Sequence, residues 1–305
     1  MEPLFSVIIP TYNRANLLLR ALESLVAQTF KCFEVIVCDD GSTDNTKEVI
    51  DLYKDKLNLT YLWEENWGGP ARPRNNGIRI AMGDWVCYLD SDDSWMPEKL
   101  EMVNKYTADY DVIYHDVEVV NVKENYKQIL KSRSLNSPVF DDLFVNINPI
   151  PNSSVCVRKT IFFQVDGQSE DLSIAGVDDY DLWLKLTKVT EKFIYVPVVL
   201  GEYNLEDYSI SKNKFSMYLG ILKVLNQYKE HPLYEKAIKK RRLQYFPYFA
   251  INNKKEAKKI FKLAFSFNFS FIAGCFLLLI PQRISKIAIN FIFKYIFKKY
   301  NYITV

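Results

Sequence analysis

The stretch Trp85-Val-Cys-Tyr-Leu-Asp-Ser-Asp-Asp93 joins an apolar run to three carboxylates, those of Asp90, Asp92 and Asp93. The apolar run predicts a buried strand, and the acids then stand at its carboxyl end, where open α/β sheets bind ligands. Neighbouring anions repel one another unless a cation or strong donors offset the repulsion. A divalent metal shared with phosphate oxygens would do so. For this stretch alone, a solvated acidic turn that caps the next helix is the competing interpretation.

The segments around this stretch alternate between strand-like and helix-like patterns. The predicted strands are 5–9, 33–38, 59–63 and 85–89. Two helices are predicted to begin at Asn16 and at Asp44, and four more are predicted at 74–82, 97–105, 178–187 and 213–230. This alternation indicates an α/β fold with a mostly parallel sheet and right-handed crossovers. No glycine-rich phosphate loop follows the first strand, which excludes a dinucleotide fold and a Walker loop.

Polar motifs follow three of the predicted strands. The first strand leads into Pro10-Thr-Tyr-Asn-Arg14, the second into Asp39-Asp-Gly-Ser-Thr-Asp44 and the fourth into Asp90-Ser-Asp-Asp93. Because the carboxyl ends of parallel strands lie along one edge of a sheet, we expect the three motifs to form one ligand crevice. Taken alone, the second motif also fits ordinary turn and helix-cap chemistry.

The net charge of +2 hides a strong asymmetry along the chain. Residues 236–305 carry 15 Lys or Arg and one acid, Glu256, which leaves 24 basic and 36 acidic residues in 1–235. Such asymmetry points to a nucleic-acid or membrane surface. Nucleic acid is the weaker choice, because the aromatic residues lie in apolar runs and do not form stacking platforms.

The pattern of apolar and basic residues in the C-terminal tail, 236–305, predicts an anchor that lies in the membrane interface. Residues 263–282 are uncharged, and a span needs about 20 apolar residues, but polar residues dilute this stretch and Pro281 closes it. Residues 284–300 follow with an amphipathic, basic pattern. Such helices lie in the interface plane, attracted by anionic lipid. A true span and a helical bundle packed on the acidic body remain as alternatives.

Cysteine and histidine usage argues against other kinds of site. The five cysteines are scattered without paired spacing, so we expect neither a disulfide framework nor a zinc site. The two histidines have no ligand-like neighbours. The first residues show no basic segment followed by a long apolar run, so no signal peptide is predicted.

Taken together, the motifs resemble those of the inverting family 2 glycosyltransferases of the GT-A fold, of the bacterial surface-polysaccharide type. The resemblance covers about residues 4–211, and its motifs stand in the family's order: Val7-Ile-Ile-Pro-Thr-Tyr-Asn-Arg14, Val37-Cys-Asp-Asp-Gly-Ser-Thr-Asp44, Arg74-Asn-Asn-Gly-Ile78, Leu89-Asp-Ser-Asp-Asp93 and Asp178-Asp-Tyr-Asp-Leu-Trp183. It implies a nucleotide-sugar donor, most simply a UDP-sugar, a cofactor of Mn²⁺ or Mg²⁺, and a lipid-linked saccharide acceptor at the inner face of the cytoplasmic membrane. The Gln-x-x-Arg-Trp pattern of processive synthases is missing, so single sugar addition is expected.

The resemblance also implies roles for individual residues. Nucleotide binding falls to Pro10, Thr11, Tyr12, Arg14, Asp40, Arg74 and Asp90. Tyr12 would face the base, and Asp40 would accept a hydrogen bond from its edge. Asp92 and Asp93 would hold the metal on the diphosphate, where it acts as a Lewis acid.

The catalytic base implied by the resemblance is Asp179. The preceding residue is usually Glu in the family and is Asp178 here. Taken alone, this pair would also fit an acidic helix N-terminus stabilised by the macrodipole. Glu206 stands where the family often has a histidine, so Glu206 is a possible ligand to metal or diphosphate, or the contact is absent.

These observations predict two parts of the chain. Residues 1–212 would form the catalytic domain, with a nucleotide-sugar-binding half at 1–110 and an acceptor-binding half at 111–212, and residues 213–305 a helical membrane-associating region. The alternative from another class is a catalytically silent nucleotide-sugar-binding scaffold, against which the presence of Asp90, Asp92 and Asp179 argues. A nucleotidyltransferase would need basic triphosphate loops that the sequence does not show.

Overall fold

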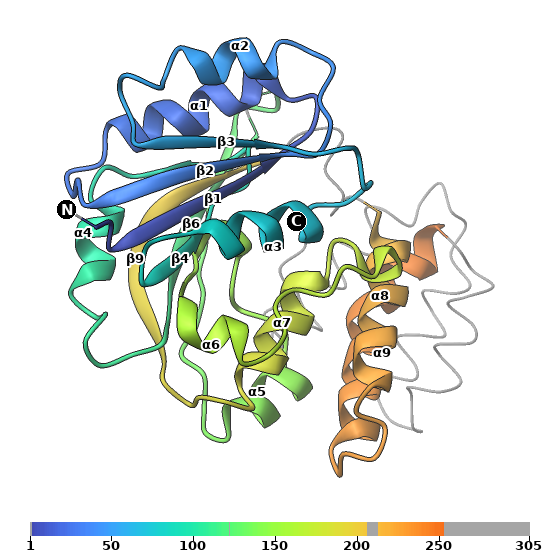
Figure 1. Cartoon of the computed structure of the whole chain (residues 1–305). Helices are drawn as coiled ribbons and strands as arrows, with labels where there is room; N and C mark the ends of the chain where they lie inside the picture. Colours follow the sequence, from blue (N-terminus) through green and yellow to red (C-terminus); the bar gives the residue numbers. More distant parts are fainter. Residues whose placement is uncertain (1, 122, 206–212, 253–305) are drawn as a thin grey trace. The chain divides into compact units, whose positions relative to one another are not determined.

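The computed structural model describes residues 2–121, 123–205 and 213–252 (Figure 1). They divide into two compact units. Of the described residues, the first unit contains 2–143 without 122 and 147–205, and the second contains 144–146 and 213–252. The functions predicted for the two parts of the chain stay predictions.

Four parallel strands form the first half of the sheet. They are β1 (Phe5–Thr11), β2 (Phe33–Asp39), β3 (Leu59–Trp63) and β4 (Trp85–Tyr88), in the order β3-β2-β1-β4. β1 pairs in parallel with both β2 and β4, and β2 pairs in parallel with β3. The predicted parallel α/β arrangement is therefore confirmed for this half. It brings the three polar motifs to the same edge, because all three precede the next helix at a strand's carboxyl end.

Helices cover both faces of these strands (Figure 1). They are α1 (Ala15–Val26), α2 (Thr46–Asp51) and α3 (Ala71–Ile80), and α4 (Lys99–Asn104) follows β4 and the short strand β5 (Ser94–Trp95). Val7, Ile9 and Val35 belong to a buried cluster with Leu18 and Leu22 of α1. The alternate side chains face α3, where a Cβ on Gly77 would collide with Cys38. The strand period of two thus supplies both faces with apolar side chains.

The second half of the sheet is mixed, which corrects the expectation of a mostly parallel sheet. Strands β8 (Cys156–Arg158), β6 (Val112–Asn121) and β9 (Phe193–Asn204) extend it in the order β4-β8-β6-β9-β5, and β7 (Tyr126–Leu130) pairs with β6. β8 runs antiparallel to both β4 and β6, whereas β6 and β9 are parallel. A three-residue strand has no periodicity of its own, so its direction could not be read from the sequence.

Short helical elements connect these strands. They are α5 (Val139–Val145), the 3₁₀ turns η1 (Asn152–Ser154) and η2 (Leu172–Ile174), α6 (Lys159–Phe163) and α7 (Asp178–Leu186). α7 confirms the helix predicted at 178–187, and its Trp183 is buried edge-to-face against Tyr88 of β4, with ring centroids 5.8 Å apart. This contact fixes the start of α7 relative to the strand that carries the aspartates.

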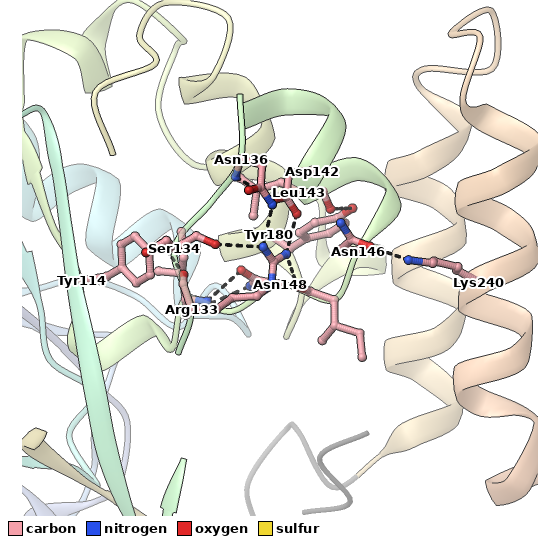
Figure 2. Close-up of polar contacts among 12 residues, drawn as sticks. Tyr114, Arg133, Ser134, Asn136, Asp142, Leu143, Asn146, Asn148, Tyr180 and Lys240 are labelled. Carbon is pink, nitrogen blue, oxygen red and sulfur yellow. Dashed lines mark hydrogen bonds and ion pairs between the residues drawn. The ribbon is translucent and has the colours of Figure 1, made fainter. Parts of the chain in front are cut away.

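Arg133 and Asp142 anchor the segment between β7 and α5 (Figure 2). The guanidinium donates to both carboxylate oxygens of Asp142, at 2.9 and 2.6 Å. The same carboxylate accepts from the backbone and side-chain N–H groups of Asn136, and Tyr114 donates to the Arg133 carbonyl oxygen. A bidentate pair of this kind is both strong and directional, so it holds the irregular segment against β6.

The second unit contains two helices that pack on each other, α8 (Lys214–Asn226) and α9 (Tyr234–Asn252). Tyr218 contacts Tyr245 and Phe249 of α9, with ring centroids 5.3 and 5.1 Å apart. Among the described residues, no helix has the length and apolarity that crossing a membrane requires. The predicted anchor at 263–300 lies outside the described residues.

Three local expectations are corrected by the structure. Asn16 lies inside α1, whose N-cap is Arg14, and α3 begins at Ala71, not at Arg74. Cys87 and Cys156 lie opposite each other on β4 and β8 and are joined in a disulfide, which corrects the expectation that the cysteines form none. Cross-strand partners 69 residues apart become neighbours only through the strand pairing.

Candidate active site

The first two motifs lie against each other at the carboxyl ends of β1 and β2. Asn13 has a positive φ of 51°, and its side-chain oxygen accepts from the backbone N–H groups of Thr43 and Asp44, at 2.8 and 3.3 Å. The Asp44 carboxylate in turn accepts from the Ala15 N–H at 3.0 Å. Pro10 and Thr11 are buried at the end of β1, and Tyr12 is 47% exposed beside them. The loop therefore presents an aromatic ring on a fixed backbone.

Asp40 follows β2 and lies beside the first motif, because its backbone N–H donates to the Thr11 carbonyl oxygen at 2.9 Å. Its carboxylate accepts from the backbone N–H groups of Trp67 and Gly68, at 2.7 and 3.1 Å, and also from the Asn66 side chain. A carboxylate offers about four lone-pair sites, so these contacts orient Asp40 without using its full acceptor capacity. Its predicted contact with a base edge stays a prediction.

The third motif forms the aspartate loop, Asp90–Asp93, after β4. Asp90 accepts from Arg74 at 2.5 Å and from the Asn152 side chain at 3.0 Å. Asp92 is ion-paired with Arg14 at 2.9 Å, and its backbone carbonyl oxygen accepts from Arg20. The structure thus brings Arg14, Asp90 and Asp92 of the predicted site together.

Asp93 is placed differently from its two neighbours. It is fully buried, and its oxygens accept from the Ser153 hydroxyl at 2.5 Å and the Asn204 N–H at 3.0 Å. Burial and the neighbouring charges of Asp92 and Asp90 raise its pKa well above the usual range. Its carboxylate therefore points into the protein, whereas those of Asp90 and Asp92 keep exposed side-chain fractions of 26% and 12%.

The donor set suits a divalent metal that is shared with a ligand. No group of three or more His, Cys, Asp or Glu residues among the described residues is arranged to hold a metal by itself. Asp90 and Asp92 supply hard oxygen ligands, and Mg²⁺ is usually bound by one or two carboxylates together with substrate phosphates. The residues present therefore fit a metal that a diphosphate completes.

Arg74 connects the aspartate loop to α7. Its side chain is buried, and its guanidinium lies 2.5 Å from Asp90 and 3.5 Å from Asp178. Arg74 is therefore not an ordinary arginine on the surface of a helix. Its predicted contact with the nucleotide stays a prediction, because both observed partners are carboxylates of the protein. A buried arginine between two acids fixes their separation.

Asp178 and Asp179 open α7 after Gly176, whose φ is 88°. Asp178 is buried and accepts from the Gly176 N–H at 2.8 Å and from Gln168 at 2.5 Å. Asp179 accepts from the Tyr180 N–H at 2.7 Å and stays partly exposed. Burial, and secondly the charge of Asp178, raise the pKa of Asp179 to about 7. A carboxylate with a pKa near neutrality and access to solvent is suited to general-base work.

A shallow pocket borders Asp178. It is lined by residues from the start of α3 and from the segment before α7, among them Trp67, Pro70 and Leu172. The Trp67 ring is partly exposed, and the Arg72 guanidinium lies 4.4 Å from its centroid. An exposed aromatic ring beside the acids of α7 offers an apolar surface to a ligand.

Some of the residues that shape the site were not found from the sequence. Asn152 and Ser153 come from η1, and Arg20 comes from the middle of α1. The only signal in the sequence was the polar triplet Asn152-Ser-Ser154 before a short apolar run, which is typical of any turn. Glu206 lies outside the described residues, so its possible role remains as predicted.

The glycosyl transferase family 2 model matches residues 6–164, more than half of the chain, and the chain belongs to this family. The matched range contains all three motifs, the third of which is the aspartate loop.

Characterised and uncharacterised relatives agree with this assignment. The chain is 29% identical over 247 residues to the Escherichia coli UDP-Glc:alpha-D-GlcNAc-diphosphoundecaprenol beta-1,3-glucosyltransferase WfgD, covering 75% of this chain and 88% of that protein. It is 29% identical to the amylovoran biosynthesis glycosyltransferase AmsB of Erwinia amylovora, covering 66% of this chain and 69% of that one. An uncharacterized glycosyltransferase of Rickettsia prowazekii is 33% identical over 62% of this chain. The chain spans only 26% to 61% of the length of the Rickettsia relatives that it matches.

Solved structures share the fold. The chain superposes on S. aureus TarS 1–349 in complex with UDP-GlcNAc with a TM-score of 0.64 at 21% identity, covering 87% of this chain and 82% of that one. It superposes on the mannosyltransferase PcManGT from Pyrobaculum calidifontis, in complex with GDP-Man and Mn²⁺, with a TM-score of 0.62 at 18% identity, covering 97% and 88%. The GT-A-like fold that the family resemblance implied is therefore confirmed, with a mixed sheet in place of the mostly parallel one that was expected.

Proposed function

We propose that this chain is an inverting, metal-dependent glycosyltransferase that moves one sugar from a UDP-sugar to a hydroxyl of a lipid-linked saccharide. The product would be part of a bacterial surface glycan such as O-antigen, capsule or lipopolysaccharide. One observation carries the proposal: Arg74 joins Asp90 of the aspartate loop to Asp178, the residue next to the candidate base Asp179. Donor-binding and proton-accepting carboxylates are thereby held in one site.

The donor would lie along the carboxyl ends of β1, β2 and β4. Tyr12 offers a face for the base, and Asp40 and Asp90 offer oxygens to the base edge and the ribose. Asp92 would hold Mn²⁺ or Mg²⁺, and a metal bound there would stabilise the charge that develops on the leaving diphosphate. Arg14, ion-paired with Asp92 at 2.9 Å, would contact the same phosphates. The role of Asp93 as a second metal ligand stays a prediction, and its buried carboxylate supports the loop through Ser153 and Asn204.

Inversion follows from a single displacement. The acceptor hydroxyl oxygen attacks the anomeric carbon from the face opposite the diphosphate, and the bond from that carbon to the diphosphate oxygen breaks with its electron pair leaving on the diphosphate. The hydroxyl proton passes to Asp179. Asp178 and Arg74 position this carboxylate, and the partly exposed Trp67 ring would offer an apolar face to the acceptor sugar.

The rate should depend on pH through Asp179. Because its pKa is raised to about 7, the base is protonated below neutrality. We therefore expect transfer to rise about tenfold per unit of pH below 7 and to level off above it. Asp178→Asn removes the neighbouring negative charge and should lower the pKa of Asp179, so the rise in rate should move to lower pH. The charges of Arg74 and Asp90 still act on Asp179 in this variant. Initial rates between pH 5 and 9 test this, and an unshifted profile in the variant would contradict the charge effect.

The identity of the donor sugar nucleotide is tested by measuring the hydrolysis of UDP-glucose, UDP-N-acetylglucosamine, UDP-galactose and GDP-mannose in the presence of Mn²⁺. We expect slow release of UDP from one of the UDP-sugars, and its suppression by EDTA. The UDP choice is supported by the names of WfgD and of the TarS complex, whereas the PcManGT complex holds GDP-Man. Tight donor binding with no turnover on any acceptor would favour the silent scaffold instead.

We also propose that the chain works as a peripheral protein at the cytoplasmic membrane face, attached by its tail. Residues 253–305 contain ten Lys or Arg and one acid, and each basic residue near an anionic leaflet contributes about 1 kcal/mol. The full chain should float with anionic vesicles, and a chain ending at Asn252 should not. High salt should weaken but not abolish flotation, because apolar contact persists when charges are screened. A full-length chain that ignores vesicles would refute the anchor.

A further inference from the structure

Ser153 of η1 contacts the aspartate loop at two places. Its hydroxyl oxygen accepts from the Asp90 backbone N–H at 3.1 Å and donates to the Asp93 carboxylate at 2.5 Å. Asp92 stands between these two residues, next to Asp93. One buried hydroxyl therefore ties both ends of the segment that carries the proposed metal ligand.

The backbone of Ser153 is held from the opposite side. Its carbonyl oxygen accepts from the Trp95 indole N–H and from the Lys99 side-chain nitrogen, each at 2.9 Å. Lys99 is fully buried, and its nitrogen lies 3.5 Å from the centroid of the Trp95 ring. The proposed reaction uses neither residue. Because these side chains come from β5 and α4, they fix Ser153 to structure outside the aspartate loop.

Asp93 is held on its second oxygen as well. The backbone N–H of Asn204, at the end of β9, donates to that oxygen at 3.0 Å. With Ser153 on one oxygen and Asn204 on the other, the Asp93 side chain is fixed at both atoms. The backbone on either side of Asp92 then has little freedom to shift, because Asp90 and Asp93 are each tied to buried partners.

We infer that Ser153 is a positioning residue that sets the Asp92 carboxylate for the metal and the diphosphate. Metal and catalytic sites require placement to within about 0.5 Å, which packed and hydrogen-bonded neighbours must supply. Displacement of a reacting group by about 1 Å can cost as much as 10²-fold in rate. The inference rests on the proposed metal role of Asp92 and adds to it the device that holds this residue.

The chain provides a matched control in the next residue. Ser154 is also a buried serine of η1, but its hydroxyl donates to the Pro151 carbonyl oxygen at 2.7 Å. Ser153→Ala and Ser154→Ala therefore delete the same atom from the same turn. Each deletes one buried hydrogen-bonding hydroxyl, so both should lower the melting temperature. Only the first removes the contacts to Asp90 and Asp93.

The experiment measures the affinity for UDP by titration calorimetry, with Mn²⁺ and with EDTA, together with the melting temperature of each variant. We expect Ser153→Ala to weaken UDP binding about tenfold or more in Mn²⁺ and much less in EDTA, because only the metal-dependent contact needs Asp92 in place. Ser154→Ala should leave both affinities within about threefold of the unaltered chain. A loss confined to the Mn²⁺ series cannot come from general loosening of the fold.

Two outcomes would overturn the inference in different ways. Equal UDP affinity of the two variants in Mn²⁺ means that Ser153 does not position Asp92, and the proposed function stands. UDP binding by the unaltered chain that ignores Mn²⁺ removes the metal role of Asp92, and the inference falls with it. If Ser153→Ala does not fold, Ser153→Cys keeps the volume with a weaker donor. That variant should show an intermediate loss in Mn²⁺, and an affinity equal to that of Ser154→Ala would again reject the role.

Discussion

Asp179→Asn is expected to abolish sugar transfer while UDP binding in Mn²⁺ stays nearly unchanged. An asparagine has almost the same shape and can still accept from the Tyr180 N–H, but it cannot take the proton from the acceptor hydroxyl. General-base assistance typically contributes about 10²–10⁴-fold in rate, equivalent to about 3–5 kcal/mol. Turnover with a fixed donor, and calorimetric titration of UDP, measure the two effects separately.

The control for this substitution is Asp55→Asn, the same chemical change at an exposed position. It should alter neither turnover nor UDP affinity. Near-normal turnover in a folded Asp179→Asn protein would reject Asp179 as the base. The role would then pass to Asp178 or to Asp181, the other acids in the first turn of α7.

The second large effect is expected for Asp92→Asn, which should remove the response of UDP binding to Mn²⁺. The amide is a weaker ligand for a hard cation than a carboxylate is, and its loss also frees Arg14 from the ion pair at 2.9 Å. The fold should survive, because asparagine has nearly the same shape, the Asp92 side chain keeps an exposed fraction of 12%, and its backbone contact with Arg20 does not depend on the carboxylate. Titration of UDP with and without Mn²⁺ decides.

Asp93→Asn is the informative comparison for Asp92→Asn. Asp93 is fully buried and hydrogen-bonded at both oxygens, so its replacement should lower the melting temperature more than that of Asp92. If Asp93→Asn instead abolished the Mn²⁺ response at an unchanged melting temperature, Asp93 would be a direct ligand. Unchanged affinity in the Asp92 variant would end the metal role assigned to that residue.

Much of the first half of the fold could be predicted because its signals are local. The runs at 5–9, 33–38, 59–63 and 85–89 are largely apolar, and three of them lead into polar motifs. All four strands and their parallel pairing are found in the structure. A buried parallel strand must be apolar on both faces, and this requirement is visible in a few consecutive residues. The second half lacked such signals, since β5 and β8 contain only two and three residues.

The sequence by itself determined which chemical groups are available. They are the aromatic ring of Tyr12 after the first strand, the carboxylates of Asp40, Asp90 and Asp92, and the acidic pair Asp178 and Asp179 at the start of a helix. Only the tertiary structure decided how they are held. Arg74 and Asp178 are 104 residues apart, and Ser153 and Asp93 are 60 residues apart. Each pair exists because strand order and helix packing bring distant segments together, and it is burial between those segments that turns a carboxylate inward at Asp93 and raises the pKa of Asp179. Hydrophobic periodicity records which face of a segment is buried, but not which polar group of another segment will meet it there.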